Sequence, residues 1–419
     1  MKQVSLKRGK EDSLLRFHPW VFSGALQHID KDIEEGDIVR VVTSNGQFIA
    51  VGHFQQGSIA VRVLTFNDVD IDEQFWVSRL SSALKLRQAV ILSSINIQPS
   101  CVASAASEQS PSATSNVTTD TYRLVHGEGD HLPGLIIDVY GKTAVMQAHS
   151  IGMHRCRQQV ADALFKVMDG QIANIYYKSD TTLPFMDNEN GFLYGGSADN
   201  IGVENGLKFR VDWLKGQKTG FFVDQRENRA LLERYAHNRQ VLNMFCYTGG
   251  FSVYAMRGGA QLVHSVDSSA KAIELTRRNM ELNFPDDARH EAFCEDAFQY
   301  LDHLPYAKEH SAEHTQYDLV ILDPPAFAKH RAALHNALKG YIRLNRMALE
   351  KMPMGSLLFT FSCSQVVTKD QFRQAVFTAA AQARRKVRIL HQLHQPADHP
   401  VNIYHPEGEY LKGLVLYVE

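Results

Sequence analysis

The stretch Val241-Leu242-Asn243-Met244-Phe245-Cys246-Tyr247-Thr248-Gly249-Gly250 decides the fold of the C-terminal half of this chain. It begins as an apolar run of strand length and ends in two glycines, after which a helical segment extends to about Arg257. The pattern then repeats, since a strand-like run at 262–267 precedes a helical segment from Ser269 to about Asn283. Strands that alternate with helices indicate βαβ units, so we expect a mainly parallel, doubly wound α/β sheet from residue 201 onward.

The loop after the first of these strands has the composition of a ligand-binding turn. Gly249 lets the backbone approach a ligand closely, and the following helix start offers N–H donors. A full GxGxxG fingerprint is absent, which favours S-adenosylmethionine over NAD. Asp267 and Asp296 end the next two strands, where a carboxylate can bind ribose hydroxyls or an adenine edge. The alternative is a purely structural turn with Asp267 as a helix cap. The expected loop contacts to the cofactor are Phe245, Tyr247, Thr248 and Gly249.

Two later strands end in residues that can carry chemistry. One apolar run, 357–361, leads into Ser362-Cys363-Ser364, and another, 318–322, leads into Asp323-Pro324-Pro325-Ala326-Phe327. In open α/β sheets the reaction takes place beyond the C-terminal ends of the strands. We therefore expect Cys363 and Asp323 to share one site.

The residue types at these strand ends favour carbon methylation of a pyrimidine. Motifs with an aromatic residue directly after Asp-Pro-Pro hold a flat amine for N-methylation, but here Ala326 intervenes before Phe327. Carbon C5 of a pyrimidine becomes nucleophilic when a thiolate adds to C6, and a base must then remove the C5 proton. Cys363 is the candidate nucleophile, and Asp323 could hold the base at N3 and its exocyclic amine. The candidate proton acceptors are Asp323, Glu407, Glu409 and a water molecule.

The bulk composition excludes several classes of protein. There are 44 Lys and Arg residues against 46 Asp and Glu, which gives a formal net charge of −2, so any nucleic-acid contact needs a local basic patch. No apolar run approaches the roughly 18 residues that span a bilayer, and the basic N-terminus lacks the apolar segment of a signal peptide. We therefore expect a cytoplasmic protein with no membrane partner.

The cysteines and histidines predict no metal site. The five cysteines are scattered without a CxxC motif, and His391, His394 and His399 lack a matching carboxylate or thiol pattern. Reduced thiols are the expectation for such a chain. Burial as small side chains is the expectation for the cysteines other than Cys363, namely Cys101, Cys156, Cys246 and Cys294.

The N-terminal half has a different organisation. Residues 1–72 read as a β-rich domain, with a hairpin around Asn45-Gly46 and a further strand at 59–64. A helix at about 73–90 opens a small α+β domain over 73–200, with strands at 134–140 and 143–147, a helix at 154–168 and a strand at 173–178. Residues 99–120 are rich in Ser, Ala and Thr, which indicates a low-complexity insertion.

Seven motifs, in order along nearly the whole chain, resemble those of one known family. The motifs are His18–Gly24, Gly127–Gly134, Gln217–Arg226, Tyr247–Phe251, Asp323–Pro325, Ser362–Ser364 and Pro406–Gly413. The chain resembles the bacterial 23S ribosomal RNA cytosine-C5 methyltransferases of the large-subunit methyltransferase I type. The insertion at 99–120 is the one departure, and it touches no motif.

The resemblance implies a three-domain enzyme. It implies a PUA RNA-binding domain at 1–72, a strand-strand-helix-strand-strand domain at 73–200 and a Rossmann-like class I methyltransferase at 201–419. It implies S-adenosylmethionine as donor and 5-methylcytosine in 23S rRNA as product. Lys218 and Thr219 would border the cofactor. The resemblance is also compatible with a homodimer. The residues that would border the RNA are Arg16, Arg226, Pro324 and Phe327.

Recognition of folded RNA would require the target base to leave its stack and reach Cys363. The PUA-like domain would contact the RNA backbone through basic residues near the N-terminus, namely Lys7, Arg8, Lys10 and Arg16. A solvated basic tail is the alternative for these four. Other readings of the whole chain are a 5-methyluridine or N-methylguanine enzyme of the same fold, or a non-catalytic RNA-binding assembly factor. The sequence does not name the modified nucleotide or the oligomeric state.

Overall fold

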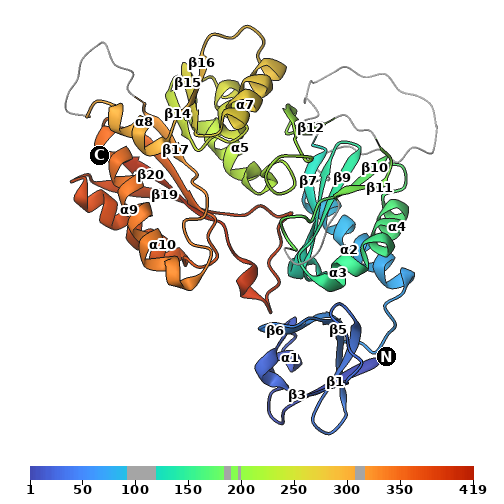
Figure 1. Ribbon diagram of the computed structural model, residues 1–419. Helices are drawn as coiled ribbons and strands as arrows, with labels where there is room; N and C mark the ends of the chain where they lie inside the picture. The colour runs from blue at the N-terminus through green and yellow to red at the C-terminus, as the bar shows by residue number, and fades with distance from the viewer. Residues whose placement is uncertain (92–118, 184–189, 197–199, 307–316) are drawn as a thin grey trace, which may run out of the picture. The chain divides into compact units, whose positions relative to one another are not determined.

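The computed structural model describes residues 1–91, 119–183, 190–196, 200–306 and 317–419. The chain divides into two compact units, each built from separate stretches of sequence (Figure 1). The first unit comprises residues 1–206, 211–223 and 397–408, and the second comprises 207–210, 224–396 and 409–419. The sequence-based division into three domains stays a prediction.

The first unit opens with a six-stranded sheet in the order β2-β6-β5-β4-β1-β3 (Figure 1). The predicted hairpin is confirmed, because β4 and β5 pair antiparallel and Gly46 in their turn has a φ of +81°. Buried valines and leucines such as Val4, Leu6 and Val39 form the core of this sheet. The elements are β1 (Lys2–Leu6), α1 (Asp12–Leu15), β2 (Trp20–Phe22), β3 (Leu26–Ile29), β4 (Ile38–Val42), β5 (Phe48–Phe54) and β6 (Ile59–Thr65).

A five-stranded sheet in the order β11-β10-β9-β8-β7 forms the other part of the first unit. The helix predicted at 154–168 is split into two helices that meet at Cys156. The predicted insertion lies outside the described residues except for Thr119 and Asp120. The elements are α2 (Glu73–Val90), β7 (Thr121–His126), β8 (Leu135–Tyr140), β9 (Thr143–Ala148), α3 (Ile151–Arg155), α4 (Arg157–Met168), β10 (Asn174–Tyr177), β11 (Gly191–Tyr194) and β12 (Ile201–Glu204).

The second unit contains a seven-stranded sheet in the order β16-β15-β14-β17-β18-β20-β19 (Figure 1). The first five strands in this order are mutually parallel, as the sequence predicts, and β20 runs antiparallel to both of its neighbours. The seven strands are β14 (Gln240–Met244), β15 (Leu262–Asp267), β16 (His290–Cys294), β17 (Leu319–Leu322), β18 (Leu357–Ser362), β19 (Val387–His394) and β20 (Lys412–Val418). Strand β13 (Leu207–Arg210) also belongs to this unit but not to the sheet.

Helices shield the apolar strands of this sheet. β17 and β18 are buried along their whole length, which explains their continuous apolar sequence. Side chains of α8, α9 and α10 share one core cluster with β17, β18 and β20, and α6 packs on β14 and β15. The helices are α5 (Arg226–Tyr235), α6 (Gly250–Arg257), α7 (Ala270–Asn283), α8 (Ala297–His303), α9 (Leu334–Lys351) and α10 (Lys369–Gln382).

The strand order and register of the sheet predict at which end of the second unit ligands bind. The chain order reverses at β14, which has β15 on one side and β17 on the other. Met244 pairs with Leu322, and Leu322 pairs with Thr360, so β14, β17 and β18 end nearly level. Ligands of open α/β sheets bind beyond such a switch point. Across the described ranges, no helix is long and apolar enough to cross a membrane.

Buried His53 makes the stability of the first unit depend on pH. Burial, with a smaller effect from Arg62, lowers the pKa of His53 from 6.5 to about 4. Between these values the unfolded chain binds a proton that the folded unit does not, so the free energy of unfolding falls as the pH falls. The slope for one such group is at most about 1.4 kcal/mol per pH unit.

We expect His53→Gln to reduce the slope of the unfolding free energy against pH between pH 6.5 and 4 by up to about 1.4 kcal/mol per pH unit. His126 and His149 of the same unit, whose pKa values are also lowered, chiefly by desolvation, keep part of the slope. Urea unfolding followed by tryptophan fluorescence measures this, because all three tryptophans, Trp20, Trp76 and Trp213, lie in the first unit. His28→Gln is the matched control, since the side chain of His28 is 65% exposed. An unchanged slope in His53→Gln would contradict this account.

Candidate active site

The loop between β14 and α6 turns through three residues with left-handed backbone. Phe245, Tyr247 and Gly249 have φ values of 58°, 48° and 79°. This conformation is costly for residues with a side chain, so neighbouring groups must hold it. The hydroxyl of Thr276 donates to the carbonyl of Tyr247 at 2.9 Å, and Asn279 Nδ2 donates to the carbonyl of Thr248 at 2.9 Å. Helix α7 therefore fixes the shape of the loop.

Asp267, at the end of β15, ties this loop to the neighbouring strand. Its Oδ2 accepts from the backbone N–H of Tyr247 at 3.0 Å, and its Oδ1 accepts from that of Ser269 at 2.9 Å. The cap of α7 is Ser269, so the alternative role of Asp267 as helix cap is wrong. Each carboxylate oxygen can accept more than one hydrogen bond, so this half-buried group can also accept from ribose hydroxyls.

Asp296 follows β16, the next strand of the sheet. Its Oδ1 accepts from the backbone N–H groups of Phe298 and Gln299 at 2.9 and 3.1 Å, which makes it the N-cap of α8. The side chain is exposed. The four predicted loop residues, Asp267 and Asp296 thus lie at the C-terminal ends of three adjacent strands. A strained loop at a helix start with two carboxylates beside it fits a nucleoside-bearing cofactor such as S-adenosylmethionine.

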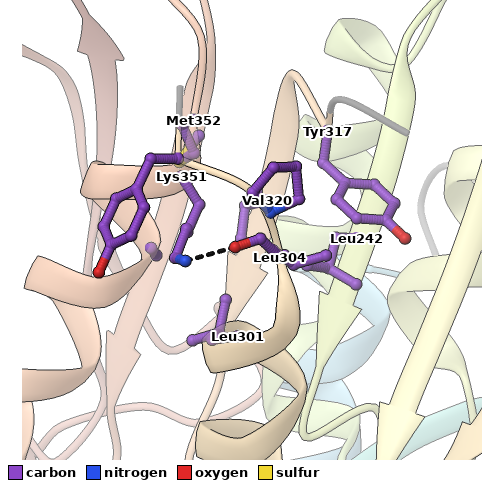
Figure 2. A pocket seen from close by; sticks show the side chains of 10 residues that line it. Leu242, Leu301, Leu304, Tyr317, Val320, Lys351 and Met352 are labelled. Carbon is purple, nitrogen blue, oxygen red and sulfur yellow. Dashed lines mark hydrogen bonds between the residues drawn. The ribbon is translucent and has the colours of Figure 1, made fainter. Parts of the chain in front are cut away.

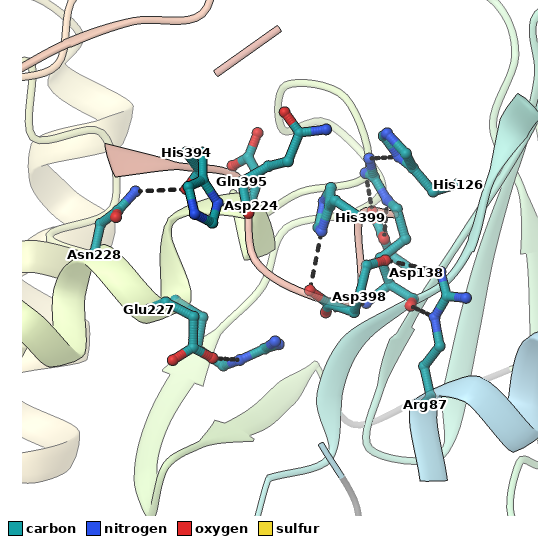
Figure 3. Close-up of polar contacts among 12 residues, drawn as sticks. Arg87, His126, Asp138, Asp224, Glu227, Asn228, His394, Gln395, Asp398 and His399 are labelled. Carbon is teal, nitrogen blue, oxygen red and sulfur yellow. Dashed lines mark hydrogen bonds and ion pairs between the residues drawn. The ribbon is translucent and has the colours of Figure 1, made fainter. Parts of the chain in front are cut away.

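Asp323 lies at the end of β17 and is held by an amide. Gln225 Nε2 donates to Asp323 Oδ2 at 3.0 Å. The Oε1 of this buried glutamine accepts from Asn228 Nδ2 at 2.6 Å. Asn228 also donates to the carbonyl of His394 at 3.4 Å (Figure 3). This chain of hydrogen bonds fixes the direction of the Asp323 carboxylate.

Cys363 follows β18, the strand next to β17, and is half-buried. Its two serine neighbours point into the protein and anchor the turn. Ser362 Oγ donates to the hydroxyl of Tyr341 at 2.9 Å, and Ser364 Oγ donates to the carbonyl of Ala328 at 2.7 Å. The thiol is thereby carried on a braced turn.

Tyr341 of α9 is fully buried and interacts with both strand ends. Burial raises its pKa to about 12, the hydrogen bond with Ser362 opposes this, and the charges of Cys363 and Asp323 raise it further. Its phenol therefore stays neutral near pH 7. Cys363 and Asp323 follow the adjacent strands β18 and β17, in which Leu322 pairs with Thr360. That they act in one site stays a prediction.

The Asp-Pro-Pro loop is anchored through Phe327. Its ring lies 4.7 Å from that of Tyr341, centroid to centroid. A Cβ on Gly340 would come within 2.9 Å of the Phe327 ring, so glycine is needed for this close packing. Pro324 is buried and Phe327 is half-buried. Their predicted contact with substrate stays a prediction.

Other predicted site residues lie elsewhere in the chain. Lys218 and Thr219 belong to the first unit, where the Thr219 hydroxyl donates to buried Asp138 at 2.6 Å. Arg16 is exposed in the same unit, whereas Arg226 is buried in the second unit. The roles of these four residues stay predictions.

The candidate proton acceptors divide between the units. Glu407 belongs to the first unit, where its carboxylate lies 3.7 Å from His18 and also 3.7 Å from His405. Glu409 shares the second unit with Cys363 and Asp323, and it pairs with Lys369.

A buried ionic network in the first unit holds the segment 397–408. Arg87 Nη2 donates to Asp130 Oδ2 and to the carbonyl of Asp398, each at 2.8 Å. The Asp398 carboxylate accepts from the backbone of Arg123 at 3.0 Å and lies 3.0 Å from His399 Nδ1 (Figure 3). Such buried ions are stable because they are paired. In the part of the chain that the structure describes, no group of three or more metal-ligating side chains occurs.

One pocket of the second unit is mainly apolar and is not lined by the residues that follow the C-terminal ends of the strands (Figure 2). Lys351 Nζ donates to the carbonyl of Leu304 at its edge. The pocket contains none of the predicted site residues. Its lining residues are Leu242, Leu301, Leu304, Pro305, Tyr306, Tyr317, Val320, Ala348, Lys351 and Met352.

Sequence reasoning missed the residues that support the strand ends. Tyr341 and Asn228 lie within helices, and Lys412 begins β20. Two of the family motifs contain supporting residues: Gln217–Arg226 includes Gln225, and Pro406–Gly413 includes Lys412. The motifs therefore pointed to these regions, but they did not indicate what the two residues do.

Family models match both halves of the chain. A model for S-adenosylmethionine-dependent methyltransferases matches residues 185–404, and a PUA-like domain model matches residues 4–66. A curated protein named "Ribosomal RNA large subunit methyltransferase I" from Tolumonas auensis is 38% identical, covering 99% of this chain and 98% of its own length. The protein of the same name from Alteromonas mediterranea is 36% identical with the same two coverages.

This chain belongs to the ribosomal RNA large subunit methyltransferase I family. The membership confirms the predicted fold class: a Rossmann-like methyltransferase sheet preceded by a PUA-like domain. It also confirms S-adenosylmethionine as the cofactor.

Solved structures agree with this fold. One, a presumed S-adenosylmethionine-dependent methyltransferase from Streptococcus mutans, has a TM-score of 0.79, 24% identity and coverage of 99% of this chain and 100% of its own. Another, a presumed methyltransferase in complex with S-adenosylhomocysteine, has a TM-score of 0.80 with the same identity and coverage.

We expect Gly249→Ala to weaken binding of S-adenosylhomocysteine by about tenfold or more, measured by isothermal titration calorimetry. The new Cβ would lie 2.7 Å from Thr276 Cγ2, and the φ of +79° is strained for alanine, so the loop must shift. Gly46→Ala is the control, since Gly46 has a φ of +81° but nothing within 4 Å of a new Cβ. Equal affinity in Gly249→Ala and wild type would remove this loop from the cofactor site.

Proposed function

We propose that this protein transfers a methyl group from S-adenosylmethionine to C5 of a cytosine in 23S rRNA, with Cys363 as the nucleophile. One observation carries the proposal: Cys363 and Asp323 follow neighbouring parallel strands of a methyltransferase sheet. The family name of its relatives supports ribosomal RNA as the substrate class.

The chain's residues divide the reaction between them. The Cys363 thiolate adds to C6 of the base, which forms an S–C6 bond and moves the C5=C6 electron pair toward C5. The Asp323 carboxyl group, directed by Gln225, accepts a hydrogen bond from the exocyclic amine of the base, and its protonated form donates one to N3. When bound, S-adenosylmethionine would supply an electrophilic methyl group. C5 forms a bond to that methyl carbon as the sulfonium S–CH3 bond breaks, and S-adenosylhomocysteine is left. A base then takes the C5 proton, the C5=C6 bond re-forms, and the thiolate leaves C6.

The positions of the candidate residues in the fold narrow the choice of the group that accepts the C5 proton. Asp323 and Glu409 share the second unit with Cys363, and Asp323 directly follows the strand next to that of Cys363. Asp323 therefore has more support than Glu409 as the acceptor within this unit. Asp323→Asn should then let the adduct form but slow its release.

RNA binding is assigned to the first unit. The PUA-like domain carries exposed basic residues before and after α1, and a cation there contacts the phosphate backbone regardless of sequence. These basic residues are Lys7, Arg8, Lys10 and Arg16. Residues 1–72 would be the RNA-binding domain, 73–200 a small α+β domain and 201–419 the methyltransferase domain.

We expect Cys363→Ala to abolish formation of 5-methylcytosine, because the proposed mechanism activates C5 through the bond between this thiolate and C6. The measurement is methyl transfer to 23S rRNA from a strain that lacks the enzyme, with mass spectrometry of the nucleosides. Cys294→Ala is the matched control, since Cys294 is exposed at the end of β16 and its predicted burial is wrong. Normal methylation by Cys363→Ala would refute the nucleophile assignment.

The identity of the product separates the other readings. If the methyl group is found on uridine or on guanosine, the protein is a 5-methyluridine or an N-methylguanine enzyme of the same fold, and the cytosine proposal is wrong. Cofactor binding without transfer to any RNA would favour a non-catalytic assembly factor.

A further inference from the structure

We propose that Lys412 is a positioning residue for Cys363, whose ammonium group braces the turn that carries the thiol and favours its thiolate form. The inference rests on the proposed nucleophilic role of Cys363.

The contacts of Lys412 surround the residue it would serve. Lys412 begins β20 directly opposite Ser362, the residue before the thiol. Its Nζ donates to the carbonyl of Ser364 at 2.5 Å and to that of Val367 at 2.6 Å. One buried cation therefore binds the backbone on the far side of Cys363 while its own strand pairs with the near side.

The position is an unusual one for a lysine. Lys412 is 5% exposed, and a buried ammonium is costly unless its surroundings compensate. Two carbonyl acceptors need N–H donors, which the ammonium form supplies best. Burial lowers the pKa of Lys412 to about 8, and the negative charge of Cys363, followed by that of Glu409, opposes this effect. The group thus remains mainly charged at neutral pH.

The other charged or titratable groups described above near this turn do not provide the same attraction. Tyr341 stays neutral, and Asp323 is an anion that disfavours a second negative charge nearby. Glu409 and Lys369 form an ion pair with each other, and both side chains are exposed to solvent. Among the groups described here near this turn, Lys412 is the one that is both buried and positively charged. Nearby cations are what favour a thiolate over a thiol in reactive cysteines.

The test is the pH dependence of Cys363 alkylation by iodoacetamide, quantified by peptide mass spectrometry on the full-length protein. Iodoacetamide reacts with the thiolate, so the midpoint of the pH profile reports ionisation without any need for RNA or methyl transfer. The exposed thiol of Cys294 is the internal reference on the same molecule. The variants are Lys412→Gln, Lys412→Met and the charge-retaining Lys412→Arg.

We expect the Cys363 midpoint to move about one pH unit higher in Lys412→Gln and Lys412→Met, with Cys294 unchanged. Alkylation of Cys363 at pH 7 should then fall about tenfold. Lys412→Arg should keep the midpoint near that of wild type. Lys178→Met is the matched control, because Lys178 is also 5% exposed and donates to a carbonyl, that of Gly216, in the first unit.

An unchanged midpoint in a folded neutral variant would overturn the inference. If Lys412→Met fails to fold, Lys412→Gln decides, because glutamine retains a donor for the turn. If both neutral variants fail to fold while Lys412→Arg folds, the charge supports the fold alone and the inference is also overturned. A shifted midpoint together with full methylation by Cys363→Ala would support the effect of Lys412 on the thiol but would overturn the proposed function, and with it the positioning role of Lys412 in catalysis.

Discussion

The parallel register of β14, β17 and β18 is the constraint on which the rest of the second unit depends. Met244 pairs with Leu322 and Leu322 with Thr360, so β14 and β17 end level with each other and β18 ends two residues further on, at Ser362. The cofactor loop, the Asp323 carboxylate and the Cys363 thiol all follow from that shared edge. A shift of one residue in this register would turn the side chains of a strand to the opposite face and separate these groups.

Loops at such an edge need support, because the sheet hydrogen bonds end there. The protein supplies it with polar side chains that are buried or half-buried: Asp267 holds the cofactor loop, Gln225 directs Asp323, and Lys412 braces the turn of Cys363. Each of these contacts joins residues at least 20 positions apart in the chain. The geometry of the reacting groups is therefore a product of tertiary structure as much as of the local motifs.

Much of this architecture could be predicted from the sequence, and the remainder could not for physical reasons. Apolar runs and glycine-containing turns predicted the parallel strands and placed Asp323 and Cys363 together, because strand ends share an edge. The antiparallel strand β20 escaped prediction, and with it the position of Lys412, since pairing between distant strands leaves no local periodicity. Tyr341 and Asn228 resemble ordinary helix residues until the fold brings them to the strand ends. The break at Cys156 also lacks a proline or glycine signal.

The central claim is a covalent bond between Cys363 and C6 of a cytosine, and its most direct test is to trap that bond. RNA that carries 5-fluorocytosine allows addition and methyl transfer, but fluorine in place of the C5 hydrogen prevents the final elimination. Mass spectrometry after proteolysis should then find the modified nucleotide attached to the peptide that contains Cys363. Turnover in the presence of cofactor that leaves no such adduct, or an adduct on another residue, would contradict the account.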